Sequence, residues 1–263
     1  MIEIVKRHLT QNPCYRANVE KADSRYVLFQ QRGPQGGTLH SVGCPQPSAL
    51  SFIKAWDKPT YTNSCVHGVI DAETGIGYET LPPNFRGWHG ASGPKGSVNN
   101  THIGIEMCES KWIKYTSGAK FEVLDLAKAR ADCKRAYETA VYWFAKLAKE
   151  WHWNVDTDII SHNEGGKKGI ASTHADPEHY WTGLGMKYTM DGFRADVKRQ
   201  MASTEMPFTD VKEGKWYYDD ILWAYENGIT SGVSKDKFGV GQPCTREQVV
   251  AFLHNYDKAR GGG

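Results

Sequence analysis

Apolar and polar residues follow two different periods along this chain, and each period predicts its own kind of element. Short runs rich in apolar and β-branched residues predict strands at 38–42, 64–70, 76–81 and 102–107. Turn-forming residues at 71–75 separate the second run from the third, so these two runs are expected to form a hairpin. Residues 90–100, mostly Gly, Ser and Asn, predict a loop.

A long helix is predicted over 121–151. Its apolar residues recur every three or four positions and form one buried stripe, made of Tyr137, Ala140, Val141, Phe144, Leu147, Ala148 and Trp151. Residues 1–40 are polar and irregular up to the first strand, 158–161 lead into a loop, and a last helix is expected over 189–201. This order favours an α/β domain over 1–201, with a mixed central β-sheet flanked by helices.

The pattern changes in the last quarter of the chain. Residues 202–207 are short, polar and end in proline, which is typical of a linker. Residues 216–227 have helix-like apolar spacing, and Gly228 follows where that helix would end. Thr245 is the expected N-cap of a second helix. We therefore predict a small all-α helix–loop–helix module over 207–260.

Composition excludes several classes of function. The chain has 263 residues, 40% of them hydrophobic, and a net charge of only +2 without a Lys/Arg cluster, so nucleic acid is not an expected partner. No apolar run approaches the roughly 18 residues that a membrane span needs, so no membrane insertion is expected. The first residues lack an apolar stretch and a cleavage site, which predicts no Sec signal peptide. Six scattered cysteines without a C-x-x-C pair favour reduced thiols.

Ten histidines are many for this length, and they are unevenly spread. On or beside the predicted strands lie His40, His67, His89 and His102; in one later loop, with Asp176, lie His162, His174 and His179. A catalytic zinc site needs three such protein ligands and an open fourth position. The sequence lacks the H-E-x-x-H pattern of helix-borne sites. Spacing alone leaves open the alternative that these histidines make buried hydrogen bonds or lie on the surface.

Five segments occur in a fixed order: Leu39–Gly43, Val66–Asp71, Gly87–His89, Ile103–Glu106, and Ser161-His162 through Asp176-Pro177. In this order they resemble the zinc-dependent N-acetylmuramoyl-L-alanine amidases related to phage lysozyme-type amidases and animal peptidoglycan recognition proteins. The resemblance covers about 1–185. It implies a peptidoglycan hydrolase that cuts the amide bond between N-acetylmuramic acid and L-alanine, with Zn2+ as its cofactor.

The resemblance also implies roles for single residues. His40, His162 and Asp176 match the zinc ligands, and Glu106 matches the catalytic carboxylate. Many members have Lys two residues before the third ligand, where this chain has His174, so a protonated His174 is expected to stabilise the oxyanion. The expected substrate contacts are His67, Trp88 and His89. Alternatives stay open: Glu106 as a surface carboxylate, His67 as a structural residue, and His179 or Cys44 as competing ligands.

Residues 207–258 resemble one S-layer homology motif, through Phe208–Val211, Trp216-Tyr217, Asn227–Gly232 and Thr245–Gln248. The resemblance implies binding to secondary cell-wall polysaccharide, with the planar guanidinium of Arg246 pairing with a carboxylate such as a pyruvyl group. Family members commonly carry three motifs that pack together. A single motif is therefore expected to form a homo-oligomer or to pack on the amidase domain, unless it is a degenerate module kept only for packing.

Together these features predict a phage or prophage endolysin, or a bacterial autolysin. The expected absence of a signal peptide favours synthesis in the cytoplasm and action at the cell wall after release through a holin-type lesion or lysis. Two alternatives remain: a non-catalytic peptidoglycan-binding protein that resembles the recognition proteins without a full ligand set, and a zinc endopeptidase of the peptide stem. The retained His40, His162, Asp176 and Glu106 favour the amidase over the first, and the order of the five segments favours it over the second.

Overall fold

The computed structural model of the chain describes residues 2–202 and 206–259. These residues fall into two compact units, one over 2–201 and the other from 202 onward. Part of the predicted linker, 203–205, and the last residue of the predicted module, 260, lie outside the described residues. None of the described helices is long and apolar enough to cross a membrane. All six cysteines are free thiols.

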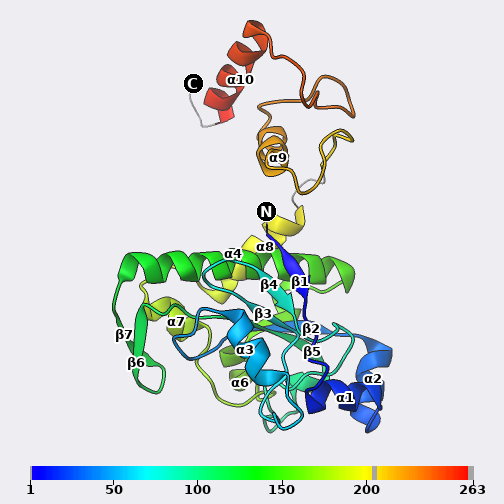
Figure 1. Cartoon of the computed structure of the whole chain (residues 1–263), viewed down its shortest axis with the longest axis vertical. Helices are drawn as coiled ribbons and strands as arrows, with labels where there is room; N and C mark the ends of the chain where they lie inside the picture. The colour runs from blue at the N-terminus through cyan, green and yellow to red at the C-terminus, as the bar shows by residue number, and fades with distance from the viewer. Residues whose placement is uncertain (1, 203–205, 260–263) are drawn as a thin grey trace. The chain divides into compact units, whose positions relative to one another are not determined.

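The larger unit alternates short strands with helices (Figure 1). Its strands are β1 (Ile4–Lys6), β2 (Gly36–Ser41), β3 (Gly68–Ile70), β4 (Gly77–Glu79), β5 (His102–Met107), β6 (Ile113–Ser117), β7 (Lys120–Val123) and β8 (Ile159–Ser161). Its helices are α1 (Pro13–Val19), α2 (Ser24–Arg32), α3 (Ala49–Trp56), α4 (Leu126–Glu150), α5 (Val155–Asp158), α6 (His162–Lys168), α7 (Glu178–Gly183) and α8 (Met190–Ala202), with a 3-10 turn at Val98–Asn100. The smaller unit contains α9 (Tyr218–Glu226) and α10 (Arg246–Ala259).

The central sheet is mixed, with six strands in the order β1-β4-β3-β5-β2-β8. Only β3 and β4 are antiparallel neighbours, and β6 pairs with β7 in a separate hairpin. Because β5, β2 and β8 run parallel, their carboxyl ends lie at one edge of the sheet. His40 on β2 is in register with Glu106 on β5, and His162 follows β8 directly. The topology therefore brings these three residues to the same edge.

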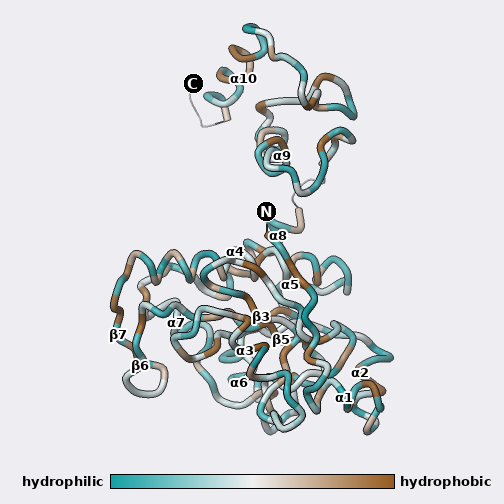
Figure 2. The backbone as a smooth tube through the Cα atoms, viewed as in Figure 1, coloured by the Kyte–Doolittle hydropathy of each residue, from teal (hydrophilic) through white to brown (hydrophobic). Residues whose placement is uncertain are grey.

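Helix α4 packs on one face of the sheet. Leu39, Ile105 and Phe144 are fully buried in the core between them, and Figure 2 shows apolar segments along the central strands. The helix can approach closely because a Cβ at Gly68 would overlap the indole of Trp143. Side chains alternate along a strand, so His40 and Glu106, which follow Leu39 and Ile105, project from the opposite face.

A second core covers this opposite face at β3 and β4. It contains Cys14 of α1, Ala49 of α3 and Val69 of β3, all fully buried. Val69 belongs to this second core whereas Ile70 belongs to the first, as the alternation requires. The predicted hairpin is confirmed, since β3 and β4 pair with Val69 opposite Tyr78.

Two expectations of irregular chain are wrong. Residues 1–40 contain β1, α1 and α2, because the side chains of Asn12 and Asp23 cap the two helices. The loop expected after residue 161 contains α6 and α7, and a capping box of Ser161 and Glu164 begins α6. The helix predicted from 121 begins instead at Leu126, after the N-cap Asp125, because the preceding residues form β7.

The smaller unit has its own small core of Phe208, Val211 and Ile221. The carboxylate of Asp210 accepts hydrogen bonds from the backbone N–H groups of Phe238, Gly239 and Val240, at 2.9, 2.9 and 3.1 Å. Both predicted helix ends are confirmed: Gly228 follows α9 with φ of 68°, and the Thr245 hydroxyl accepts from the N–H of Gln248 at 3.3 Å. None of the residues of α10 is buried.

Candidate metal centre

Three ligand-type side chains converge at the carboxyl edge of the parallel strands. His40 lies on β2, His162 is the first residue of α6, and Asp176 precedes α7. All three are buried, and one ligand atom of each lies within 4.8 Å of the others. The structure thus brings together the three residues that the sequence suggests as metal ligands.

Hydrogen bonds behind His40 determine which of its ring nitrogens carries the proton. His89 Nε2 lies 3.0 Å from the carbonyl oxygen of His102, which can only accept, so Nε2 donates. Burial lowers the pKa of His89 well below its usual value, so the ring is neutral and its Nδ1 accepts. This Nδ1 is 3.1 Å from His40 Nε2, which must therefore donate. His40 Nδ1 is left with a free lone pair.

His162 is oriented in the same way. The hydroxyl of Ser172 lies 3.5 Å from the carbonyl oxygen of Gly90, to which it donates, and 3.1 Å from His162 Nε2. The hydroxyl oxygen therefore accepts from Nε2–H, and the lone pair of His162 is on Nδ1. The capping box at the start of α6 fixes the backbone from which this ring projects.

Two imidazole lone pairs and a carboxylate therefore face one another. His40 Nδ1 is 3.1 Å from His162 Nδ1 and 3.2 Å from Asp176 Oδ2, and His162 Nδ1 is 3.5 Å from Asp176 Oδ1. Acceptor atoms this close repel one another unless a cation lies among them. Around tetrahedral zinc, with bonds of about 2.0–2.1 Å, neighbouring ligand atoms are about 3.4 Å apart. The donor set and its spacing therefore fit a zinc-sized cation.

His174 lies against the outer side of this group. Its Nδ1 is 3.4 Å from Asp176 Oδ1, and its ring stacks on that of His162 with centroids 4.2 Å apart. The hydrogen bond to Asp176 raises the pKa of His174, which favours the imidazolium form. Burial by itself raises the pKa of Asp176, but hydrogen bonding to the neighbouring imidazoles holds that pKa below its usual range. Since the facing nitrogens of His40 and His162 carry no proton, His174 is the imidazole that donates to this carboxylate. Asp176 is therefore ionised.

The centre opens into a cavity of about 530 Å³ whose lining includes Glu106, His174 and Tyr115. Glu106 Oε2 is buried and has no hydrogen-bond partner among the described residues. Burial, with smaller contributions from the charges of Asp176 and Glu109, raises the pKa of Glu106 well above its usual value. A carboxyl group with these properties beside a metal centre can accept a proton and return it.

Comparison with known proteins decides the family. Residues 30–179 match the family model of N-acetylmuramoyl-L-alanine amidases, and residues 207–250 match the S-layer homology domain. The chain belongs to the N-acetylmuramoyl-L-alanine amidase family. Both resemblances expected from the sequence are thereby confirmed.

Individual relatives cover different parts of this amidase-family chain. The N-acetylmuramoyl-L-alanine amidase XlyB of Bacillus subtilis is 25% identical over 212 residues, which are 81% of this chain and 48% of the relative. A cell surface protein of Thermoanaerobacter kivui is 46% identical over 48 residues, 18% of this chain and 6% of the relative. The chain thus spans about half or less of the curated relatives it matches.

A solved structure confirms the expected mixed α/β fold. The crystal structure of the Staphylococcus aureus hydrolase AmiA, in complex with its ligand, is similar with a TM-score of 0.53 and 17% identity. The similarity covers 76% of this chain and 83% of the AmiA chain.

Two expected substrate contacts of the amidase unit need correction. His67 is 2% exposed; its Nε2 donates to the carbonyl oxygen of Phe85 at 2.8 Å, and its Nδ1 accepts from the N–H of Gly104 at 3.0 Å. Burial lowers the pKa of His67 to about 4. Trp88 donates from Nε1 to the hydroxyl of Tyr26 at 3.1 Å and packs against the second core. His67 is therefore a buried structural residue, and the half-buried Trp88 is not among the residues that line this cavity.

His89 does line the cavity, but its ring nitrogens are occupied by His40 and by the carbonyl group of His102. A Cβ at Gly104 of the IGIE segment would overlap the His89 ring. Gly104 therefore leaves space for His89, and His89 orients His40. We therefore assign His89 a positioning role in place of the expected substrate contact.

One buried polar group was not predicted from the sequence; it lies behind Tyr115 and His179, which line another wall of the cavity. Glu109 is fully buried and accepts from the Tyr115 hydroxyl at 2.7 Å and from the N–H of Gly43 at 3.2 Å. The same hydroxyl lies 2.7 Å from His179 Nε2, so His179 is engaged here, and neither it nor Cys44 belongs to the converging ligands. The one available clue was a second carboxylate immediately after the apolar strand that carries Glu106.

We predict that His89→Ala preserves the fold but lowers zinc affinity by about 10- to 100-fold, because His40 loses the acceptor that keeps its proton on Nε2. Competition with a chromogenic chelator measures this affinity. His102→Ala is the matched control, since it keeps the backbone carbonyl to which His89 donates. Equal zinc affinity of the His89 variant and the natural protein would contradict the proposed orientation of His40.

Glu109 predicts a pH-dependent stability difference. Burial raises its pKa from 4.5 to about 7, so the folded protein binds this proton more tightly than the unfolded chain does. The stability linked to this group is present below pH 4.5 and is lost as the pH rises to about 7. In Glu109→Gln no such proton exists. The variant should therefore gain up to about 3 kcal/mol relative to the natural protein between pH 4.5 and 7.5.

Urea unfolding in the presence of a chelator at a series of pH values tests this expectation. The amide of the variant can still accept from Gly43 and donate to Tyr115, so hydrogen bonding is conserved. A stability difference that does not change with pH would show that Glu109 does not titrate as its burial requires.

Proposed function

We propose that this chain is a zinc-dependent hydrolase of the amide bond between N-acetylmuramic acid and L-alanine in peptidoglycan. One observation carries the proposal: the free lone pairs of His40 Nδ1 and His162 Nδ1 and the Asp176 carboxylate converge beside a cavity lined by Glu106, whose Oε2 has no hydrogen-bond partner among the described residues. The match of residues 30–179 to the amidase family supports the same substrate class.

Each residue of the centre has a chemical task in this proposal. When bound, zinc would polarise the scissile carbonyl and make the attacking water more acidic. Glu106 takes a proton from that water and delivers it to the amide nitrogen, so that L-alanine leaves as a neutral amine. His174 donates to the carbonyl oxygen while negative charge develops there, an effect worth on the order of 3 kcal/mol in comparable sites. His89 and Ser172 keep the two ligand imidazoles in the required tautomers.

The alternative of a non-catalytic peptidoglycan-binding protein is less well supported. Binding alone requires neither three converging acceptors nor a buried carboxyl group beside them. Such groups are costly to bury unless a ligand or a reaction uses them. A zinc endopeptidase would need a different family assignment from the one that residues 30–179 support.

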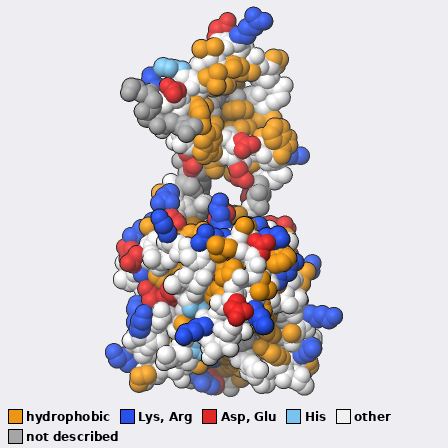
Figure 3. Space-filling view, turned by 90° about the vertical axis from the view of Figure 1, so that its left-hand side faces the viewer, with side chains coloured by type: hydrophobic (Ala, Val, Ile, Leu, Met, Phe, Trp, Pro, Cys, Tyr) orange, Lys and Arg blue, Asp and Glu red, His pale blue; other side chains and the backbone are white. Residues whose placement is uncertain are grey.

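The C-terminal unit is proposed to attach the enzyme to secondary cell-wall polysaccharide. Arg246 is exposed in the first turn of α10, where its guanidinium can pair with a carboxylate of the polymer. Val250 and Leu253 of the same helix are 66% and 63% exposed, and Figure 3 shows hydrophobic side chains gathered on this unit. We propose that this apolar surface packs against a second copy, giving a homo-oligomer.

The site of action is proposed to be the bacterial cell wall. The chain would act as a phage or prophage endolysin released through a holin-type lesion or lysis, or as a bacterial autolysin. The combination of an amidase family match with an S-layer homology match supports action at the wall in either case.

Glu106→Gln is expected to retain about one zinc per chain but to lose at least about 100-fold in turnover, the usual scale of general base catalysis. His174→Ala should also retain zinc and lose turnover. The matched control is Glu122→Gln, an exposed carboxyl group on β7. Mass spectrometry of digested peptidoglycan measures the new free L-alanine amines, and elemental analysis measures the zinc.

Three outcomes would contradict these assignments. Near-normal turnover of Glu106→Gln removes Glu106 from the mechanism. Loss of zinc from His174→Ala moves the ligand role from Asp176 to His174. New reducing sugar ends instead of free amines would replace the amidase with a glycosidase.

Removal of the C-terminal unit after Met201 should preserve cleavage of soluble wall fragments and weaken binding to whole walls. Arg246→Gln should reproduce the loss of binding in the full chain, whereas Lys258→Gln at the other end of α10 should not. Light scattering should give a larger mass than the monomer for the full chain only. Equal wall binding by the full and shortened chains refutes attachment, and a monomeric full chain refutes oligomerisation alone.

A further inference from the structure

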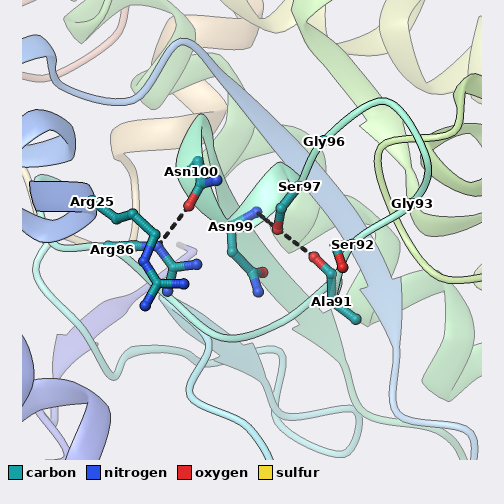
Figure 4. A pocket seen from close by; sticks show the side chains of 9 residues that line it. All are labelled: Arg25, Arg86, Ala91, Ser92, Gly93, Gly96, Ser97, Asn99 and Asn100. Carbon is teal, nitrogen blue, oxygen red and sulfur yellow. Dashed lines mark hydrogen bonds between the residues drawn. The ribbon is translucent and has the colours of Figure 1, made fainter. Parts of the chain in front are cut away.

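A second cavity, of about 420 Å³, lies between α2 and the loop at 90–100. Figure 4 shows the guanidinium groups of Arg25 and Arg86 reaching into the same space, beside Asn99 and Asn100. About 13 Å of β5, the rise of four residues, separates His102 near this cavity from Glu106 at the metal centre. This cavity and the candidate metal centre are therefore two different sites.

Arg86 is the unusual member of this cavity, because it is 6% exposed and forms no ion pair with any residue that the structure describes. Its Nε donates to Asn100 Oδ1 at 2.8 Å, and its guanidinium carbon lies 5.3 Å from the centroid of the Tyr26 ring. Among the described residues, its two terminal nitrogens have no hydrogen-bond partner and no carboxylate lies within ion-pair distance. A guanidinium group remains charged in proteins, and Arg86 lines the cavity, so these nitrogens are available to donate to an anion there.

Arg25 adds a second positive charge to the cavity. Its guanidinium pairs with Asp23 at 2.6 Å and is 59% exposed. Two guanidinium groups and one carboxylate leave a net charge of +1. Burial, with the charge of Arg25 acting in the same direction, lowers the pKa of Arg86, although Tyr26, Cys14 and Asp23 partly oppose this shift.

Asn99 supplies a neutral donor. It is 7% exposed, and its Oδ1 accepts from the N–H groups of His89 and Gly90, both at 2.9 Å. The oxygen is thereby occupied, and the amide nitrogen has no partner among the described residues. The cavity thus combines two cations and a spare amide donor, and the donors of all three suit an oxygen acceptor.

We propose that this cavity binds one oxyanion, a carboxylate or phosphate group, between Arg25 and Arg86. In a bacterial cell wall, the carboxylates of peptide stems and the phosphodiesters of wall polymers both carry this chemistry. The anion site itself is independent of the proposed amidase activity, and only its natural source rests on that proposal.

Titration calorimetry with inorganic phosphate and with acetate, at constant ionic strength in chloride, tests the site in the full chain. Arg25→Gln should weaken binding of the better ligand by about tenfold, the scale of one charge-assisted hydrogen bond. Arg86→Gln should weaken it further. The matched control is Arg32→Gln, which removes an exposed charge from the same helix and should leave the affinity within about twofold.

Arg25 lies on the surface, so its variant keeps the test decisive even if Arg86→Gln does not fold. Binding of neither anion, or equal affinity of the natural protein and Arg25→Gln, overturns the proposal. A loss in Arg32→Gln equal to that in Arg25→Gln also overturns it, because the effect would then be one of overall charge.

Purified walls identify the source of the anion. Binding of the natural chain and Arg25→Gln is compared, with a chelator present to prevent cleavage, on intact walls and on walls stripped of phosphodiester polymers by hydrofluoric acid. An advantage of the natural chain that persists on stripped walls identifies peptide carboxylates, and one that disappears identifies phosphodiesters. No advantage on either wall refutes the wall as the source. Each readout is binding, so failure here is distinct from failure of the amidase proposal.

Discussion

Electrostatic repulsion among three acceptor groups is the constraint on which the larger unit depends. His40 Nδ1, His162 Nδ1 and the Asp176 carboxylate lie 3.1–3.5 Å apart, closer than acceptors settle by themselves. The fold holds them there through the parallel register of β2 with β5 and β8 and through the packing of α4 beneath that sheet. The two imidazoles donate from Nε2 to His89 and Ser172, and this keeps protons away from the two facing Nδ1 atoms. A cation bound among the three groups would attract each of them, so their enforced proximity favours metal binding.

The sequence was most informative where function depends on residue type in a fixed order. The order of the motif segments was enough to suggest His40, His162, Asp176 and Glu106, because metal and proton chemistry require those side chains. The sequence was least informative where the hydrogen-bond partner of a side chain is a backbone atom. Nothing in the segment around His67 indicates that its ring joins the carbonyl group of Phe85 to the N–H of Gly104, since only the folded register brings those groups together.

Short-range signals were also available and overlooked. Asn12 and Asp23 each precede a helix that was expected to be irregular chain, and Asp125 marks the start of α4. By contrast, the hydroxyl of Tyr115 contacts Glu109 and His179, and these three residues come from the β6–β7 hairpin, the segment that follows β5, and α7. No local pattern contains that information, because its members meet only through tertiary packing.

The loop at 90–100 joins the two candidate sites physically. Asn99 lines the cavity that we propose binds an oxyanion, and its Oδ1 accepts a hydrogen bond from the N–H of His89. The ring of His89 in turn orients His40. At the start of the same loop, the carbonyl oxygen of Gly90 accepts a hydrogen bond from the hydroxyl of Ser172, which orients His162. The tautomers of both ligand imidazoles are therefore set by His89 and Ser172, and both of these residues are hydrogen-bonded to the loop at 90–100. A long polymer held at the arginine pair would contact the same segment that keeps the metal ligands in place, so binding and bond cleavage would share one structural support.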